Sequence, residues 1–372
     1  MRVFIIFVLG IIAVNLYAAD KVLVAVLSSF AKPEKLGENF RDNDSDTWDD
    51  IESHVRFGAR LFADRYCPKE IVIKDYDTGE STESTLKAVH QAEKDGAKII
   101  MGFVVSSSIL TINKLYPDRK IPIITMMASH EEVGGKMPPT LQMSYDDKLQ
   151  GKSLARVFTQ MPAKERKNPF LLTDMTNPFS VGLSRQFRKK LPPSSVHELE
   201  YVTPMKWPPK GWDLNALKTA TTIIMTGEGR EVLEVVRQLS KFNQSYILVG
   251  GDGWYRGNVT QYLPPRGVYI PDSLTLGHWT PRLPDPDSQE FGKKYKAKYK
   301  ADPGGTAAMA HDGMKTICKV WKEKHNLSFD SFVGVSVPGL TGTIQFNSRG
   351  KQDTKTPLLY EFRNGSYHYE RF

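Results

Sequence analysis

The chain has 372 residues, of which 40% are hydrophobic and 25% charged, which excludes a disordered chain, a collagen-like chain and a low-complexity chain. Because single hydrophobic cores rarely grow beyond about 250–300 residues, this length predicts two lobes or domains. The formal net charge of +8 is small for the length, and the basic clusters alternate with acids or aromatics, so we expect solvated helix faces and no nucleic-acid partner.

The N-terminal residues 1–18 have the features of a signal peptide. Arg2 gives a positive start, an apolar run covers residues 3–14, and Ala18 marks the expected cleavage site. The alternative is an uncleaved membrane anchor, but the run is shorter than the roughly 20 residues that span a bilayer. No cysteine stands directly after the run, which argues against a lipid anchor. We therefore expect an exported, periplasmic protein.

After the signal peptide, strand patterns alternate with helix patterns. In the first part, strands are expected at residues 21–27, 70–75, 98–102 and 121–125, with helices at 47–66 and 81–95 and from Ser107. The alternation restarts with helices at 147–160, 179–190, 228–241, 288–299 and 305–323, and strands at 169–173, 199–202, 222–226, 246–249, 342–346 and 358–362. Asn364-Gly365 is typical of a hairpin turn. This order predicts an α/β fold with two lobes, each a parallel sheet covered by helices on both faces.

Four loops that follow strands are candidates for the functional site, because ligands of open parallel sheets bind at the carboxyl ends of the strands. They cover residues 102–108, 125–130, 173–179 and 249–255. The serines of the first loop can cap a helix, which needs only one of them, or offer donors to an anion. A phosphate loop is a weak rival for the glycine-rich fourth loop, because no Gly-Lys-Ser/Thr follows and an acid has the wrong sign for phosphate.

Several segments in this order resemble the type I periplasmic solute-binding proteins of ABC transporters, in their branched-chain amino-acid (Leu/Ile/Val-like) subfamily. The similar segments are residues 102–108, 121–125 with Ala128 and Ser129, 150–155 (QGKSLA), 340–347 (LTGTIQFN) and Asn364-Gly365. The resemblance implies two α/β lobes joined by three hinge crossovers, with a small ligand clamped between them. It also implies an ABC permease in the inner membrane as partner and a monomeric protein. We expect residues 19–146 and 274–347 in the first lobe, and 147–273 and 348–372 in the second.

The resemblance also assigns ligand contacts residue by residue. Ser106 and Ser107 match the hydroxyl loop that holds a ligand's carboxylate, and Met127 and Ser129 match the loop that meets an amino-acid head group. Asp252 matches the acid that pairs with an α-ammonium. A zwitterion needs this arrangement, because donors near helix starts hold its carboxylate while an acid on the other lobe holds its ammonium.

Other positions depart from the family. Phe179 stands where relatives usually have Tyr, and Glu228 falls close to a position that is often aromatic. The loop after the first strand, residues 28–33, lacks the relatives' glycines. Phe179, Trp254 and Tyr255 could form the apolar wall of the site, although packing within a lobe explains Trp254 and Tyr255 equally well. A turn between glycines also explains Asp252.

The cysteines and histidines give no sign of catalysis. Cys67 and Cys318 could form a disulfide in an oxidising compartment, or Cys318 could be a buried thiol within a helix. His130-Glu131-Glu132 lacks the second histidine of a zinc helix motif, and no Gly-x-Ser-x-Gly elbow is present. We expect no enzyme activity, no cofactor and no metal.

These observations favour a solute-binding protein that captures an amino acid or similar small polar ligand for an ABC importer. The alternative is the same fold acting as a ligand sensor or envelope-assembly module, and an extracellular hydrolase is a minor rival. The sequence does not name the ligand, because the wall positions are those that depart from the family.

Overall fold

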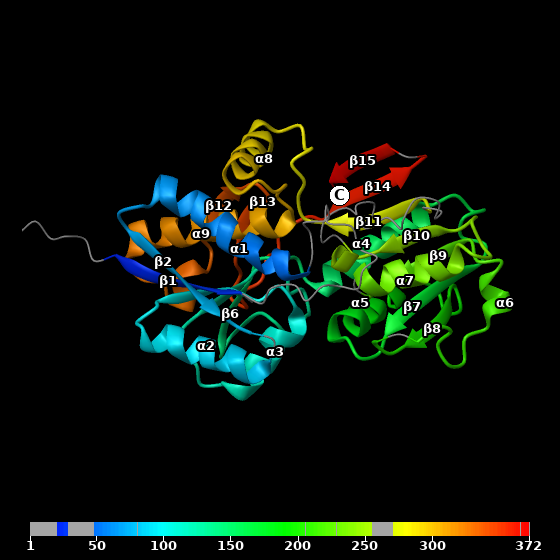
Figure 1. Cartoon of the computed structure of the whole chain (residues 1–372), viewed down its shortest axis with the longest axis horizontal. Coiled ribbons are helices and arrows are strands. Elements are labelled where there is room, and N and C mark those ends of the chain that lie inside the picture. Colours follow the sequence, from blue (N-terminus) through cyan, green and yellow to red (C-terminus); the bar gives the residue numbers. More distant parts are fainter. Residues whose placement is uncertain are drawn as a thin grey trace, which may run out of the picture.

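The computed structural model describes residues 21–28, 48–79, 81–204, 206–227, 229–254, 271–364 and 366–371. These residues form two lobes that lie side by side, each built on its own sheet (Figure 1). The expected signal peptide, Glu228 and Tyr255 lie outside the described residues. None of the helices in the described part of the chain has the length and apolar character that crossing a membrane requires.

The first lobe contains a six-stranded sheet that is parallel apart from β5. Its strands, in spatial order, are β2 (Ile71–Asp77), β1 (Val22–Ser28), β3 (Ile99–Gly102), β4 (Ile123–Thr125), β6 (Pro139–Gln142) and β5 (Gly135–Lys136). Strand β1 has apolar residues at nearly every position and pairs with β2 and β3 on its two sides. This is the expected behaviour of a parallel strand that is covered on both faces.

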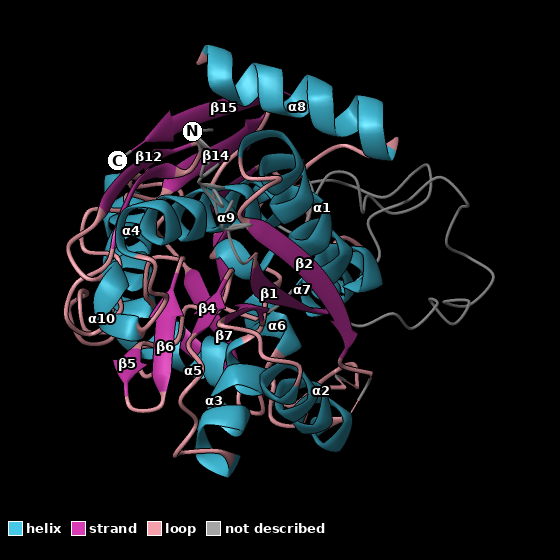
Figure 2. Ribbon diagram, turned by 90° about the vertical axis from the view of Figure 1, so that its left-hand side faces the viewer, coloured by secondary structure: helices cyan, strands magenta, loops and turns pink. Residues whose placement is uncertain are grey.

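Helices cover both faces of this sheet, as Figure 2 shows. One face packs against α1 (Trp48–Tyr66) and α9 (Gly305–Lys324), and the other against α2 (Thr82–Lys94) and α3 (Ser106–Leu115). The short helix α10 (Phe329–Phe332) and the hairpin of β12 (Ser336–Gly339) and β13 (Gly342–Gln345) complete the lobe next to α9. Even and odd residues of β1 point into different cores, since Val24 and Val26 join the first and Ala25 and Leu27 the second.

The second lobe contains a seven-stranded sheet. Its strands, in spatial order, are β15 (Ser366–Arg371), β14 (Leu358–Arg363), β11 (Ser273–Gly277), β10 (Ile247–Gly250), β9 (Thr222–Met225), β7 (Pro169–Asp174) and β8 (His197–Tyr201). The five strands from β11 to β8 are parallel, whereas β14 and β15 run antiparallel. Arg363 pairs with Ser366, and Asn364 has a positive φ of 49°, so the expected two-residue hairpin is confirmed.

Helices also cover both faces of the second sheet. Helices α4 (Asp147–Gln160) and α5 (Pro178–Arg188) pack on one face, and α6 (Leu214–Leu217) and α7 (Gly229–Leu239) on the other. The chain signals where two of these helices begin, because Asp146 accepts the Leu149 N–H at the start of α4 and Asn177 caps α5 ahead of Pro178.

Three crossovers connect the lobes. They run from β6 to α4, from β11 to α8 (Pro286–Tyr299) and from β13 to β14. Next to them, Trp279, Phe291, Tyr295 and Tyr360 form an apolar cluster that joins α8 to the second sheet. The architecture is that of two α/β lobes with three crossovers, as expected. The exact lobe boundaries remain a prediction, but β11 pairs with β10 and β14, which places residues 274–277 with the second sheet instead of the first.

A disulfide joins Cys67, just after α1, to Cys318 in α9. Their Cα atoms lie 6.5 Å apart, and both residues are buried in the core that α1 and α9 share. The sequence left open whether Cys67 and Cys318 form a disulfide, and the structure shows that they do.

Candidate functional site

The loops singled out from the sequence meet between the two lobes. Val104, Val105, Ser106, Met127 and Ser129 from the first lobe, and Phe179, Asp252 and Gly253 from the second, line one cavity. Its volume is about 20 Å³, which is room for about one water molecule. The lobes are therefore closed on each other, and a guest of amino-acid size requires them to move apart at this point.

The first-lobe wall of the cavity is held by Ser106, which begins α3. Its Oγ accepts hydrogen bonds from the backbone N–H groups of Ser129 and His130, both at 3.1 Å. In the same loop, the Ala128 carbonyl oxygen accepts from the side chains of Gln142 and Ser144, at 2.9 and 2.8 Å. Ser106 therefore ties the two first-lobe loops together, and its own O–H remains able to donate.

The second-lobe wall is formed by Asp252, which directly follows β10 and its glycine pair. Asp252 is buried, and its two carboxylate oxygens accept from Gln150 Nε2 at 2.9 Å and meet His278 Nε2 at 2.8 Å. Its backbone N–H donates to Gln150 Oε1 at 3.0 Å. A Cβ at Gly251 would lie 2.0 Å from this same Gln150 oxygen, so a side chain there would displace Gln150. The acid predicted to face a ligand is thus already held by two side chains.

Asp252 is connected through His278 to the crossovers. The His278 ring stacks on Tyr145 with ring centres 4.2 Å apart, and the Tyr145 hydroxyl donates to the Gly277 carbonyl oxygen at 3.2 Å. Tyr145 precedes α4, and His278 follows β11, so each lies in a different crossover. Burial, with Asp252 and Asp147 nearby, raises the pKa of Tyr145, which stays neutral.

Phe179 and Met127 contribute to the apolar part of the wall. Phe179 is the second residue of α5, and its backbone N–H is capped by Asn177 at 3.0 Å. Its ring lies so close to Gly253 that a Cβ there would approach Phe179 Cε1 to 2.7 Å. The ring therefore fills much of the space that a ligand side chain would need.

The other sequence-predicted residues are placed differently. Ser107 is exposed on α3 and does not line the cavity. Trp254 is buried in the second lobe's core beside α7 and does not reach the cavity, which agrees with the packing explanation. Glu228 lies outside the described residues. The structure thus brings five of the eight candidates, Ser106, Met127, Ser129, Phe179 and Asp252, to one cavity. Their roles as ligand contacts stay predictions.

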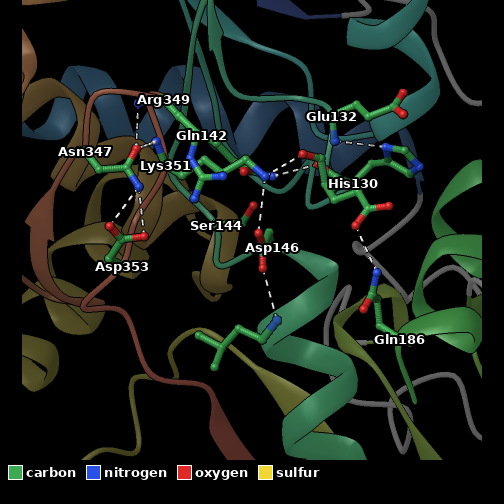
Figure 3. A network of polar contacts seen from close by, with 12 residues as sticks. His130, Glu132, Gln142, Ser144, Asp146, Gln186, Asn347, Arg349, Lys351 and Asp353 are labelled. Atoms are coloured by element: carbon green, nitrogen blue, oxygen red, sulfur yellow. Dashed lines mark hydrogen bonds and ion pairs between the residues drawn. The ribbon is translucent and has the colours of Figure 1, made fainter. Parts of the chain in front are cut away.

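A second contact between the lobes lies beside the cavity, in the loop after Ser129. The Glu131 carboxylate pairs with Arg185 of α5 and accepts from Gln186 Nε2 at 2.9 Å. Figure 3 shows Gln186 approaching the loop that carries His130 and Glu132. Burial lowers the pKa of His130, because a charged ring would be poorly solvated there.

Lys351, in the third crossover, ties this loop to the start of α4. Its ammonium donates to the Glu131 carbonyl oxygen and lies 3.2 Å from Asp146 Oδ2, as seen beside Asp146 in Figure 3. One cation thus links the first-lobe loop, the first crossover and the third crossover.

Comparisons with known proteins agree with this arrangement. The family model described as periplasmic binding protein matches residues 51–352. A search of curated proteins found no match. Among solved structures, a leucine-binding protein LivK from Thermotoga maritima is 19% identical with a TM-score of 0.75, covering 94% of this chain and 97% of its own. LivJ from Streptococcus pneumoniae, in complex with isoleucine, is 16% identical with a TM-score of 0.76, covering 95% and 99%.

A third structure, a solute-binding protein of an ABC transporter from Rhodopseudomonas palustris in complex with 3,4-dihydroxybenzoic acid, is 15% identical with a TM-score of 0.72, covering 95% and 96%. Fold and interlobe cavity define a two-lobed binding protein of type I architecture, as the sequence resemblance implied. The chain belongs to the periplasmic binding protein family.

Proposed function

We propose that the protein is an exported solute-binding protein that captures an amino acid or a similar small polar ligand between its lobes and delivers it to an ABC importer. The observation that carries this proposal is the shared cavity, with hydroxyl groups from Ser106 and Ser129 on one wall and Asp252 on the other. Hydroxyls suit a ligand's carboxylate, and the acid suits its ammonium.

The neighbours' ligands support a small carboxylate as the common element. The solved structures include complexes with isoleucine, with leucine and with 3,4-dihydroxybenzoic acid. An amino acid and an aromatic acid share the carboxylate, and only the amino acid carries an ammonium. Since Asp252 already accepts from Gln150 and meets His278, an ammonium would share this carboxylate with them.

The same proposal includes the cellular location of the protein, its partner and its type of activity. The N-terminal signal peptide with cleavage near Ala18 would place the monomeric protein in the periplasm, where an inner-membrane ABC permease is its partner. Binding rather than turnover is the proposed activity, since the similar solved structures are substrate-binding proteins of ABC transporters.

A thermal-shift screen of the purified protein against amino acids, aromatic acids and small amides tests this proposal. A ligand at 100 times its dissociation constant should stabilise the protein by about 2.7 kcal/mol. The shift should be abolished in Ser129→Ala and kept in Ser366→Ala, a serine on the exposed hairpin end. A shift that survives Ser129→Ala and Asp252→Asn unchanged would place the ligand elsewhere.

A further inference from the structure

Asp147, the first residue of α4, lies behind the cavity wall and belongs to none of the contacts assigned so far. It is fully buried, and its backbone N–H donates to the Ser129 carbonyl oxygen at 2.8 Å. Its carboxyl rests against α5, where a Cβ on Gly182 would lie 2.6 Å from Oδ2. Among the described residues, neither carboxyl oxygen has a partner at regular hydrogen-bond geometry. The Ser129 hydroxyl lies near enough to the carboxyl to lower its pKa.

The charged groups around Asp147 do not stabilise the ionised, carboxylate form of its side chain. Asp252, Asp146 and Glu131 are the acids that face it. The nearby lysine and arginine pair with two of these acids, Lys351 with Asp146 and Arg185 with Glu131. The His278 ring contacts the third acid, Asp252. Burial is the main cause that raises the pKa of Asp147 well above its usual value. The Ser129 hydroxyl opposes this rise, and the three acids add to it. His130 and Tyr145, the other titratable neighbours, both favour their neutral forms.

The state of this carboxyl decides what Ser129 can offer to the cavity. The Ser129 backbone N–H is already used by Ser106 Oγ, so the hydroxyl is the donor that Ser129 has left. A carboxylate only accepts, and it would draw the single Ser129 hydroxyl proton away from the cavity. A carboxylic acid has an O–H of its own, which can donate to Ser129 Oγ and leave the serine proton free.

We propose that Asp147 is a positioning residue, which the folded protein keeps as a neutral carboxylic acid so that the Ser129 hydroxyl donates into the cavity, toward a ligand's carboxylate. The identity of the ligand group rests on the proposed function. The state of Asp147 and its effect on Ser129 rest on the described contacts alone. An ionised Asp147 would turn the Ser129 proton inward and add a negative charge behind the ligand's carboxylate.

Infrared difference spectra between the ligand-free wild type and its ligand-free variants test the first half of the proposal, the neutral state of Asp147. At pH 7 the wild type should show the carbonyl stretch of a protonated carboxylic acid, which disappears in Asp147→Asn and persists in Asp118→Asn, an exposed acid. In Ser129→Ala the band should shift, because the acid loses its acceptor. Absence of a band that depends on Asp147, or a band that Ser129→Ala leaves in place, overturns the proposal.

Titration with L-leucine over the pH range in which the infrared band of Asp147 disappears as the pH is raised tests the second half. Across that range the affinity of the wild type should fall, by up to tenfold per pH unit, whereas Asp147→Asn should bind with equal affinity throughout. Equal pH profiles of the two proteins across that range overturn the positioning role. If the wild type binds no L-leucine at any pH, the amino-acid ligand is contradicted, while the infrared spectra still decide the state of Asp147.

Discussion

Gln150 holds Asp252 at two points, donating to its carboxylate at 2.9 Å and accepting its backbone N–H at 3.0 Å. Both residues are buried, and Gln150 lies one turn into α4, directly after the first crossover. The acid of the cavity wall is therefore fixed to the helix that begins where the chain enters the second lobe. With His278 on its other oxygen, Asp252 is a rigid part of the wall, whose position follows that of the crossovers.

Gln150→Leu should destabilise the protein by about 1.5–3 kcal/mol. The substitution removes a bond to a buried charged group and leaves the Asp252 N–H without an acceptor. Urea denaturation measures the loss. Lys152→Ala, an exposed position on the same helix, should change stability by less than about 0.5 kcal/mol. Equal stability of Gln150→Leu and Lys152→Ala would show that the two hydrogen bonds between Gln150 and Asp252 do not form in solution.

Glu131→Ala should weaken closure of the lobes. It removes the ion pair with Arg185 and the bond from Gln186, which join the first lobe to α5. Because both partners are partly exposed, the effect on closure is about 0.2–1 kcal/mol. Small-angle scattering should report a larger radius of gyration than for the wild type, and added salt should move the wild type in the same direction. Glu132→Ala, a neighbour whose backbone makes the contact to His130, serves as control. If Glu131→Ala is as compact as the control, the contacts of Glu131 with Arg185 and Gln186 do not help to close the lobes.

Reduction of the disulfide should destabilise the protein by about 2–5 kcal/mol, because Cys67 and Cys318 close a very long loop of the unfolded chain. Thermal unfolding with and without reductant measures the effect. The double variant Cys67→Ser/Cys318→Ser should unfold at the lower temperature under both conditions. A wild type whose unfolding ignores the reductant would contradict the bridge.

Asp312 should make stability depend on pH at the acidic end. This buried acid of α9 accepts from the backbone N–H groups of Leu340 and Thr341 and from the Thr341 hydroxyl. Burial alone would raise its pKa, but bonds from His311 and Thr341 lower it below the usual 3.8. For a carboxyl whose pKa is lowered on folding, the stabilisation is complete above the unfolded value and is lost as pH falls through the folded value.

Asp312→Asn should therefore cost about 1–3 kcal/mol at neutral pH, and the difference from the wild type should shrink as the pH falls below about 4. Denaturation at a series of pH values is the measurement, with the exposed Asp302→Asn as control. A difference that is constant down to pH 2 would refute the role of the charge.

The parts of the fold that the sequence predicts are those with strong local patterns. Strand β1 is a continuous apolar run, and α4 and α5 have capping residues at their starts. The sequence pattern does not predict strands β6 and β11, because each is short and mixes polar with apolar residues. Their pairing is decided by neighbours distant in sequence.

The candidate site was predictable to the same extent. Ser106 and Ser129 follow strands of the first sheet and Asp252 follows a strand of the second, so topology places each at the carboxyl edge of its own sheet. Gln150 and His278 were missed as partners of Asp252, since each reaches it from another element. The segment 150–155 carries part of the family resemblance, but no local signal says where its glutamine points. Trp254 was ambiguous, since an aromatic residue after a strand fits a core as well as a wall.

A crystal structure of the protein with the strongest solute from the thermal-shift screen tests the central claim most directly. The solute should lie between Ser106 and Ser129 of one lobe and Phe179 and Asp252 of the other, in a cavity enlarged from about 20 Å³ by movement of the lobes or of the Phe179 ring. Solute bound outside this space, for instance in the groove between α1 and α8, with the interlobe cavity still the size of one water, would contradict it.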